Sequence, residues 1–312
     1  MLLVRPRDTV TTYRCLRIAM PALVVLLAVS LADQVFAPDP NCWLGSISAY
    51  YYTASRPAFV ASLTAIGACL VIYAGNTPRE DFALNLSGVM AFVVAFVPTP
   101  LARLDVDPVR PSCQRSNVPT KDQLTAAVDN NMLALLVTAT VVLAIAYVFT
   151  VAGSGPGRPS LALVLMTALL AAAWVVYVVD RSLIRDDAHL AASVGMFGGI
   201  MAVVLLNALP PGRTDVGAVP APPTYGRIYL VLFVVMAVAG SVFAVIAWSG
   251  RYQHTVFWLE AVLTGLFAVF WVVQSTELWT VASRVPEAAV EEAEAGAGPG
   301  SAGQPVRNES AR

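Results

Sequence analysis

Three ionisable side chains stand in or beside apolar stretches of the chain, and they are the first candidates for chemistry. Glu260 lies five residues past Thr255, at the start of an apolar run, and therefore roughly 7–8 Å along a helix that rises 1.5 Å per residue. His254 immediately precedes this run, and His189 begins another. Ionisable residues are costly in hydrocarbon and mark functional sites by default. These three side chains therefore indicate a binding or proton-handling site.

Further polar residues are expected at the same depth. Asp186 precedes His189 by three residues, which places both on one helical face. Convergence at one depth predicts an outward-facing polar pocket for a lipid headgroup or a small ligand. The competing interpretation is a set of ordinary helix-start and interfacial residues, for which Asp186 is well suited. The predicted ligand-binding residues are Asp33, Arg56, Asp129, His189, His254 and Glu260.

Several familiar chemistries are excluded by what the sequence lacks. Its only lysine is Lys121, in a predicted loop, so no apolar segment offers a Schiff-base lysine. The sequence has no Walker loop, dinucleotide-binding glycine pattern, paired-cysteine metal motif, His-Glu-x-x-His or Gly-x-Ser-x-Gly. Zinc or haem ligation by the two histidines has no diagnostic spacing. We predict no catalytic residue, no metal site and no cofactor.

The amino-acid composition indicates whether the chain folds in water or in a lipid bilayer. Of its 312 residues, 57% are hydrophobic and 12% are charged, against about 45–50% and about 25% in soluble domains. The net charge of −1 and the lack of a dense basic patch exclude nucleic acid as a partner. The composition therefore predicts a membrane protein whose main partner is the lipid bilayer.

The apolar residues fall into eight runs of about the 20 residues that a helix needs to cross a bilayer. The runs are Ile18–Ala37, Pro57–Ala74, Phe82–Val97, Met132–Val151, Ser160–Val179, Ala188–Leu209, Ile228–Trp248 and Thr255–Val273. The alternating pattern of a membrane β-barrel is absent. We predict an all-α, polytopic transmembrane helix bundle of about eight spans in residues 18–284. Its external loops are expected at about residues 38–56 and 100–128, and residues 120–123 predict a capping box that starts the fourth helix early.

The ends of the chain suggest its orientation. The basic segment of residues 1–17 carries four arginines, whereas the first loop carries only Arg56. By the positive-inside rule both termini are cytoplasmic, in the cell membrane of a bacterium. Cleavage of the first run as a signal peptide is the alternative. Residues 285–312 form an acidic tail rich in alanine and glycine, which predicts disorder.

The four cysteines divide into two kinds. Cys42 and Cys113 fall in the two external loops, and disulfides persist in oxidising compartments. This placement predicts a Cys42–Cys113 bridge, with free thiols as the alternative. Cys15 and Cys69 lie at or within apolar runs and are expected to be small buried hydrophobic residues.

The first external loop carries the densest motif, Ser46-Ile47-Ser48-Ala49-Tyr50-Tyr51-Tyr52-Thr53, followed by Arg56-Pro57-Ala58-Phe59. Its tyrosines suit an aromatic belt at the headgroup level, and Arg56 suits a phosphate. The S-x-S-x-Y-Y-x-T and R-x-x-F patterns, with the H-x-x-x-x-x-E segment that ends at Glu260, resemble an uncharacterised bacterial family of multi-pass membrane proteins. That family is distantly similar to Frag/DRAM/Sfk-type membrane proteins associated with lipid homeostasis. The resemblance implies a lipid-associated membrane protein and assigns no reaction.

Three functions remain open from the sequence. The first is non-enzymatic binding of a lipid headgroup or small molecule in the polar pocket. The second is a membrane-embedded, zinc-dependent lipid hydrolase, with both histidines and one carboxylate about 2.0–2.2 Å from a shared metal. The third is a proton-coupled transporter that uses Glu260, with Gln274 and Glu277 as its polar continuation and Gly195 and Gly199 allowing close helix approach.

Overall fold

The computed structural model describes residues 6–36, 43–100, 120–154, 160–212, 219–249 and 254–284. Within these ranges the chain is helical and has no strand, which confirms the predicted all-α class. The helices are α1 Pro6–Val35, η1 Ser48–Tyr52, α2 Arg56–Ile72, α3 Pro78–Phe96, α4 Lys121–Ser154, α5 Leu161–Val179, α6 Arg181–Ala208, α7 Pro223–Ser249 and α8 Thr255–Glu277. Cys42, Cys113 and the tail of residues 285–312 lie outside the described residues.

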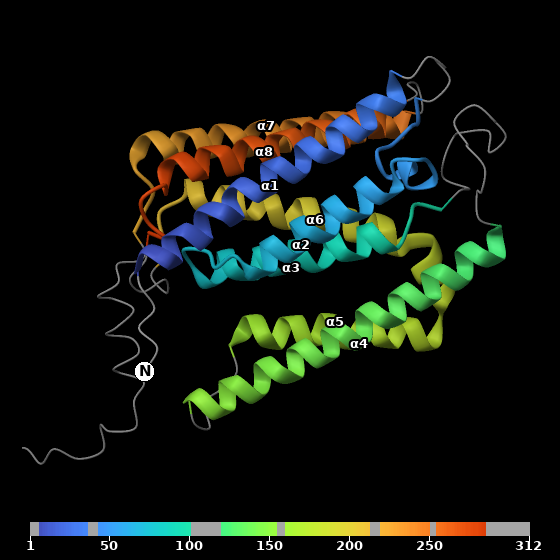
Figure 1. Ribbon diagram of the computed structural model, residues 1–312, viewed down its shortest axis with the longest axis horizontal. Coiled ribbons are helices and arrows are strands. Elements are labelled where there is room, and N and C mark those ends of the chain that lie inside the picture. The colour runs from blue at the N-terminus through green and yellow to red at the C-terminus, as the bar shows by residue number, and fades with distance from the viewer. Residues whose placement is uncertain are drawn as a thin grey trace, which may run out of the picture.

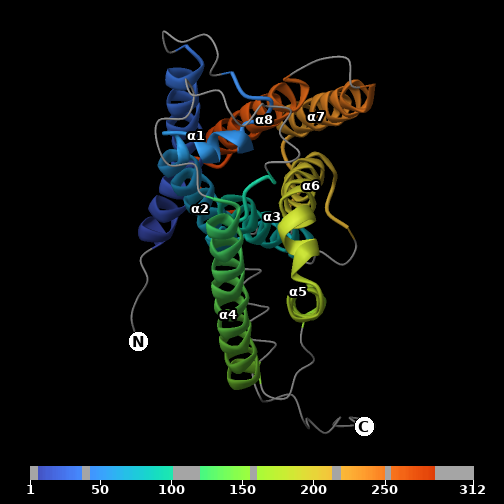
Figure 2. The ribbon, with the colours of Figure 1, turned by 90° about the vertical axis from the view of Figure 1, so that its right-hand side faces the viewer.

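Six of the helices form a closed ring in the order α1, α2, α3, α6, α7 and α8, with α8 packed against α1 (Figure 2). One hydrophobic core joins them and includes Met20 of α1, Tyr229 of α7 and Trp271 of α8. Successive helices run in opposite directions, so α1 begins and α8 ends at the same end of the molecule (Figure 1). We call this the tail end. The opposite end, which holds η1 and the start of α8, is the cap end.

Helices α4 and α5 form a hairpin that stands outside the ring (Figures 1 and 2). A separate hydrophobic cluster attaches it at the cap end, through Val97, Met132 and Ile184 among others. A hydrogen bond from Asn131 Nδ2 to the Phe96 oxygen supports the attachment to α3, while one from Tyr177 Oη to the Asp129 oxygen joins the two helices of the hairpin to each other. Most of the hairpin surface is exposed and apolar, as expected for helices that face lipid.

Small residues bring α2, α3 and α6 into close contact. A Cβ on Gly67 would lie 2.8 Å from the Gly88 oxygen, and one on Gly88 would lie 2.6 Å from the Gly67 oxygen. A Cβ on Gly199 of α6 would clash with Ser87 Oγ of α3 and would lie 3.0 Å from the Ala83 oxygen. Glycine is therefore required at these positions for the helices to approach this closely. The close approach predicted for Gly199 is confirmed.

Among the described residues, six helices are long and apolar enough to cross a membrane: α1, α4, α5, α6, α7 and α8. The other two predicted spans do not have both the length and the apolar composition that a membrane-crossing helix needs. Helix α2 is apolar but has only 17 residues, and α3 begins with the charged Arg79, Glu80 and Asp81. The chain is thus a polytopic helical membrane protein, in which six of the eight α-helices of the described ranges have the length and composition of a span.

The structure moves several predicted boundaries and confirms one cap. Helix α1 begins at Pro6 and α6 at Arg181, so both start well before the predicted spans. Thr120 Oγ1 accepts from the Gln123 amide while Gln123 Oε1 accepts from the Thr120 amide, which confirms the predicted capping box. Cys15 is an exposed free thiol, because it faces away from the core, so its predicted burial is wrong.

Candidate functional site

The loop motif and the histidine–glutamate segment meet at the cap end. Residues 43–52, which we call the cap segment, pack against the start of α8. Glu260 accepts hydrogen bonds from the Ile47 amide, at 2.5 Å, and from Ser48 Oγ, at 2.9 Å. His254 Nδ1 lies 3.2 Å from the Leu44 oxygen. The Glu260 carboxylate is therefore bonded to the protein's own loop on both oxygens.

His254 has an unusual backbone at this contact. It is the N-cap residue of α8 and adopts a left-handed conformation with φ of 66°. Its ring lies 5.3 Å from that of Trp43, centroid to centroid. Few residues other than glycine adopt this conformation, because the Cβ is crowded there. The packing against Trp43 and the contact with Leu44 hold it in place.

The tyrosines of the motif are not an aromatic belt. Tyr50 and Tyr51 are buried among the helices of the ring rather than exposed at a headgroup level, which corrects that interpretation. Tyr51 Oη accepts a hydrogen bond from Arg56 Nη2 at 2.7 Å, and the guanidinium carbon of Arg56 lies 4.3 Å from the Tyr51 ring centroid. Tyr52 Oη donates to the Thr99 oxygen. The motif thus builds the compact core of the cap end.

The remaining predicted site residues have other partners. Asp129 pairs with Arg185, whose Nε donates to it at 2.9 Å, and this joins the hairpin to α6. His189 is buried, with Nδ1 against the Val97 oxygen and with Nε2 unpartnered. Asp33 is exposed near the end of α1. The cap segment thus contacts Arg56, His254 and Glu260. Asp129 and His189 lie elsewhere, where the α4–α5 hairpin meets the ring. Ligand binding by the six residues stays a prediction.

The sequence analysis missed a buried polar cluster at the tail end. We call it the tail cluster: Arg17, Tyr73, Asn76, Glu80, Asn207, Tyr229, Gln274, Glu277 and Arg284. Its acidic centre is Glu80, only 2% exposed, which accepts from the Asn76 amide at 2.8 Å and from Asn207 Nδ2 at 2.8 Å. Gln274 extends the cluster onto α8 through a 3.5 Å contact with Asn207. Amides within apolar spans were the available signal, since such side chains bond across membrane helices.

The basic part of the cluster holds the segment that follows α8. Arg17 is fully buried and donates to Tyr73 Oη at 2.9 Å and to the Leu278 oxygen at 2.7 Å, and also to the oxygens of Val281 and Ala282. In the sequence, Arg17 is one of the four arginines of residues 1–17 that suggest the orientation of the chain. Its bonds place a cation at the carbonyl end of α8, where the helix dipole favours positive charge.

An ion pair closes the cluster at the end of the described chain. Arg284 Nη2 lies 2.7 Å from Glu277 Oε2, and both side chains are almost completely buried. Burial by itself lowers the pKa of Arg284, but the hydrogen bond and charge of Glu277 outweigh it and raise the pKa above its usual value. Arg284 therefore keeps its positive charge at any physiological pH.

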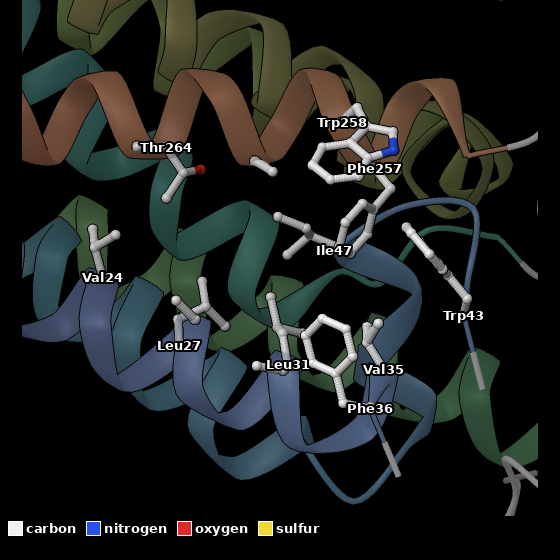
Figure 3. A pocket seen from close by; sticks show the side chains of 14 residues that line it. Val24, Leu27, Leu31, Val35, Phe36, Trp43, Ile47, Phe257, Trp258 and Thr264 are labelled. Atoms are coloured by element: carbon white, nitrogen blue, oxygen red, sulfur yellow. The ribbon is translucent and has the colours of Figure 1, made fainter. Parts of the chain in front are cut away.

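A groove lies between α1 and α8 beside the cap segment, with a volume of about 310 Å³. Figure 3 shows side chains of α1 facing those of α8 across it, with Trp43 and Ile47 on the same cavity. It is apolar: the only hydroxyl among its lining side chains is that of Thr264. The lining residues are Val24, Leu27, Ala28, Leu31, Ala32, Val35, Phe36, Trp43, Ile47, Phe257, Trp258, Ala261, Thr264 and Gly265. None of the six predicted site residues lines it.

Metal and family relationships add no further assignment. Within the described ranges no group of three or more histidine, cysteine, aspartate or glutamate side chains is placed to hold a metal ion. His189 and His254 contact different backbone carbonyls, those of Val97 and Leu44. Comparisons of the chain with protein families, with curated proteins and with solved structures find no match.

Proposed function

We propose that this is a non-enzymatic protein of the cell membrane that binds a membrane lipid, with one acyl chain in the groove between α1 and α8. The observation that carries the proposal is the groove's nearly uniform apolar lining. Both helices that form it have the length and hydropathy of membrane spans, so it lies at hydrocarbon depth. A polar ligand there would leave its own polar groups unpaired, at a cost of several kcal/mol. An acyl chain has no such groups.

The lipid headgroup is expected at the cap end. Trp43 and Trp258 line the groove there, with ring centroids 6.0 Å apart, and tryptophan favours the membrane interface. His254 packs on Trp43, and Asp33 follows the lining residue Ala32. With both termini cytoplasmic, the cap end faces outward and the bound lipid belongs to the outer leaflet. A volume of about 310 Å³ suits part of one lipid, since ligand pockets hold about 300–1,000 Å³.

Gly265 allows a direct test. A Cβ at this position meets no atom within 4 Å, and Gly265 lines the groove, so we expect a leucine side chain here to occupy part of the groove. We expect Gly265→Leu to reduce photo-crosslinking of a phospholipid with a diazirine in its acyl chain several-fold. The matched control is Gly240→Leu on α7, where a Cβ also meets open space but no groove residue is near in sequence.

The crosslinked peptides separate specific from general lipid contact. In vesicles of the natural chain, crosslinks should concentrate in residues 24–36 and 257–265, with a lower, uniform level on α4 and α5. Crosslinks of equal density on all lipid-facing helices, unchanged by Gly265→Leu, would overturn the proposal.

The two alternatives have weaker support. A zinc-dependent lipid hydrolase requires three ligands at one metal position, and the described residues offer no such group. A proton-coupled transporter is favoured only by Gln274 and Glu277, which belong to the tail cluster. Both Glu260 oxygens are bonded to the cap segment, which favours a structural role for this carboxylate over a transport role.

A further inference from the structure

We propose that Glu260 is the positioning residue of the lipid groove: it holds the cap segment against α8 and so sets one wall of the groove. This inference rests on the proposed lipid-binding function and adds the residue that controls it. Glu260 does not line the groove itself. It acts through Ile47, whose backbone amide it binds and whose side chain is part of the lining.

The cap segment is attached to α8 by hydrogen bonds of its backbone. Its residues 45–47 belong to no helix or strand, so their backbone groups depend on partners outside regular secondary structure. Two such partners lie on α8: the Phe257 amide donates to the Gly45 oxygen at 2.8 Å, and Glu260 accepts from the Ile47 amide. Ile47 and Ser48 are both buried. A buried amide that loses its acceptor pays its full desolvation cost.

A carboxylate is suited to this task because each group that it contacts is a donor: the Ile47 amide, Ser48 Oγ and the Ser48 amide. The Ile47 amide and Ser48 Oγ each bond to a different oxygen of Glu260. Glutamine has one acceptor oxygen for the Ile47 amide, and its NH₂ group can donate to Ser48 Oγ, because a hydroxyl accepts as well as donates. Substitution by glutamine therefore preserves the size of the side chain and replaces the bonds to a charged group by weaker neutral ones.

The wall of the groove depends on this attachment. Trp43 and Ile47 come from the cap segment, while Phe257 and Trp258 come from α8. The Trp43 ring lies 6.1 Å from that of Phe257 and 6.0 Å from that of Trp258. If the segment moves off α8, these contacts open and the groove loses its closure at the cap end. The lipid then loses part of its apolar contact without any change in α1 or α8.

The experiment measures the segment and the lipid in the same variant. In Glu260→Gln, we expect hydrogen–deuterium exchange of residues 43–52 to accelerate roughly 5- to 10-fold, as for the replacement of hydrogen bonds to a charged group by neutral ones. Crosslinking of the diazirine phospholipid at residues 24–36 should fall several-fold. Ser48→Ala, which removes only the hydroxyl bond, should change both in the same direction. Asp186→Asn, an exposed carboxylate at the same end, is the matched control.

The outcomes separate the two proposals. Faster exchange with unchanged crosslinking overturns the positioning role, while the loss of crosslinking in Gly265→Leu still supports lipid binding. Unchanged exchange in both Glu260→Gln and Ser48→Ala also overturns it, because the segment is then held by other contacts. If the natural chain shows no concentrated crosslinks, lipid binding fails and the positioning role fails with it. If Glu260→Gln does not fold, Ser48→Ala decides by the same two measurements.

Discussion

Replacing Gly88 by alanine should destabilise the protein, because α2 and α3 touch through this glycine. The added Cβ would lie 2.6 Å from the Gly67 oxygen and 2.7 Å from Val71 Cγ2. Ordinary van der Waals contact begins near 3.4 Å, so the helices would separate by about 0.8 Å, the difference between 3.4 and 2.6 Å. The Gly67 oxygen is a backbone atom inside a helix and cannot rotate away. The strain must therefore spread into the packing of both helices.

The size of the effect follows from that separation. A gap of about 0.5–1 Å removes a quarter to a half of the dispersion energy of each contact, and overpacking a core typically costs about 1–3 kcal/mol. Since two contacts fall below 3.0 Å, we expect the upper end of that range. Alanine regains about 1 kcal/mol through its higher helix propensity. The net loss is about 2 kcal/mol, or about 30-fold in the unfolding equilibrium.

The matched control is Gly198→Ala on α6, where a Cβ meets no atom within 4 Å. This variant gains helix propensity without a clash and should be as stable as the natural chain or slightly more so. Unfolding by sodium dodecyl sulfate in mixed micelles, followed by circular dichroism, compares all three proteins. Equal stability of Gly88→Ala and the natural chain would refute the close approach of α2 and α3, and with it the spacing of the ring.

Two further predictions concern the tail end and the start of α6. Arg17→Met should release the segment after α8, because the oxygens of Leu278, Val281 and Ala282 lose their donor at about 1–3 kcal/mol per unpaired buried group; trypsin should then cut after Arg284 faster than in Arg14→Met, which loses a single exposed bond to the Trp279 oxygen, and equal rates would contradict it. Asp180 caps α6, and hydrogen bonds from the Ser182 hydroxyl and amide lower the pKa of its carboxyl. The stabilisation is therefore present above the unfolded pKa of about 3.9 and is lost as the pH falls through the lower folded pKa. Asp180→Ala should reduce the melting temperature at pH 7, and the difference should shrink below pH 4; a constant difference from pH 7 to pH 3 would show that the charge plays no part.

The candidate site was only partly predictable from the sequence. Glu260 and His254 stand out because they are ionisable residues beside an apolar run, and the loop motif stands out by its density. The contact between the loop motif and the start of α8 joins residues more than 200 positions apart in the sequence, Ile47 and Glu260. Arg17 counts toward orientation in the sequence, whereas its burial against Leu278 depends on the pairing of α1 with α8. The groove has no motif at all, since its residues are ordinary membrane aliphatics and aromatics.

The sequence by itself determined the class of the protein. Backbone N–H and C=O groups inside a bilayer must form their hydrogen bonds within the protein, and apolar runs of this length do so as helices. It also determined local features such as the capping box at Thr120 and Gln123, whose partners are three residues apart. The tertiary structure alone decided which polar groups meet. The closure of the ring, through α8 packed on α1, brings Glu260 to the cap segment and Arg17 to the end of α8. Those contacts arise from packing between helices distant in sequence, and no local spacing encodes them.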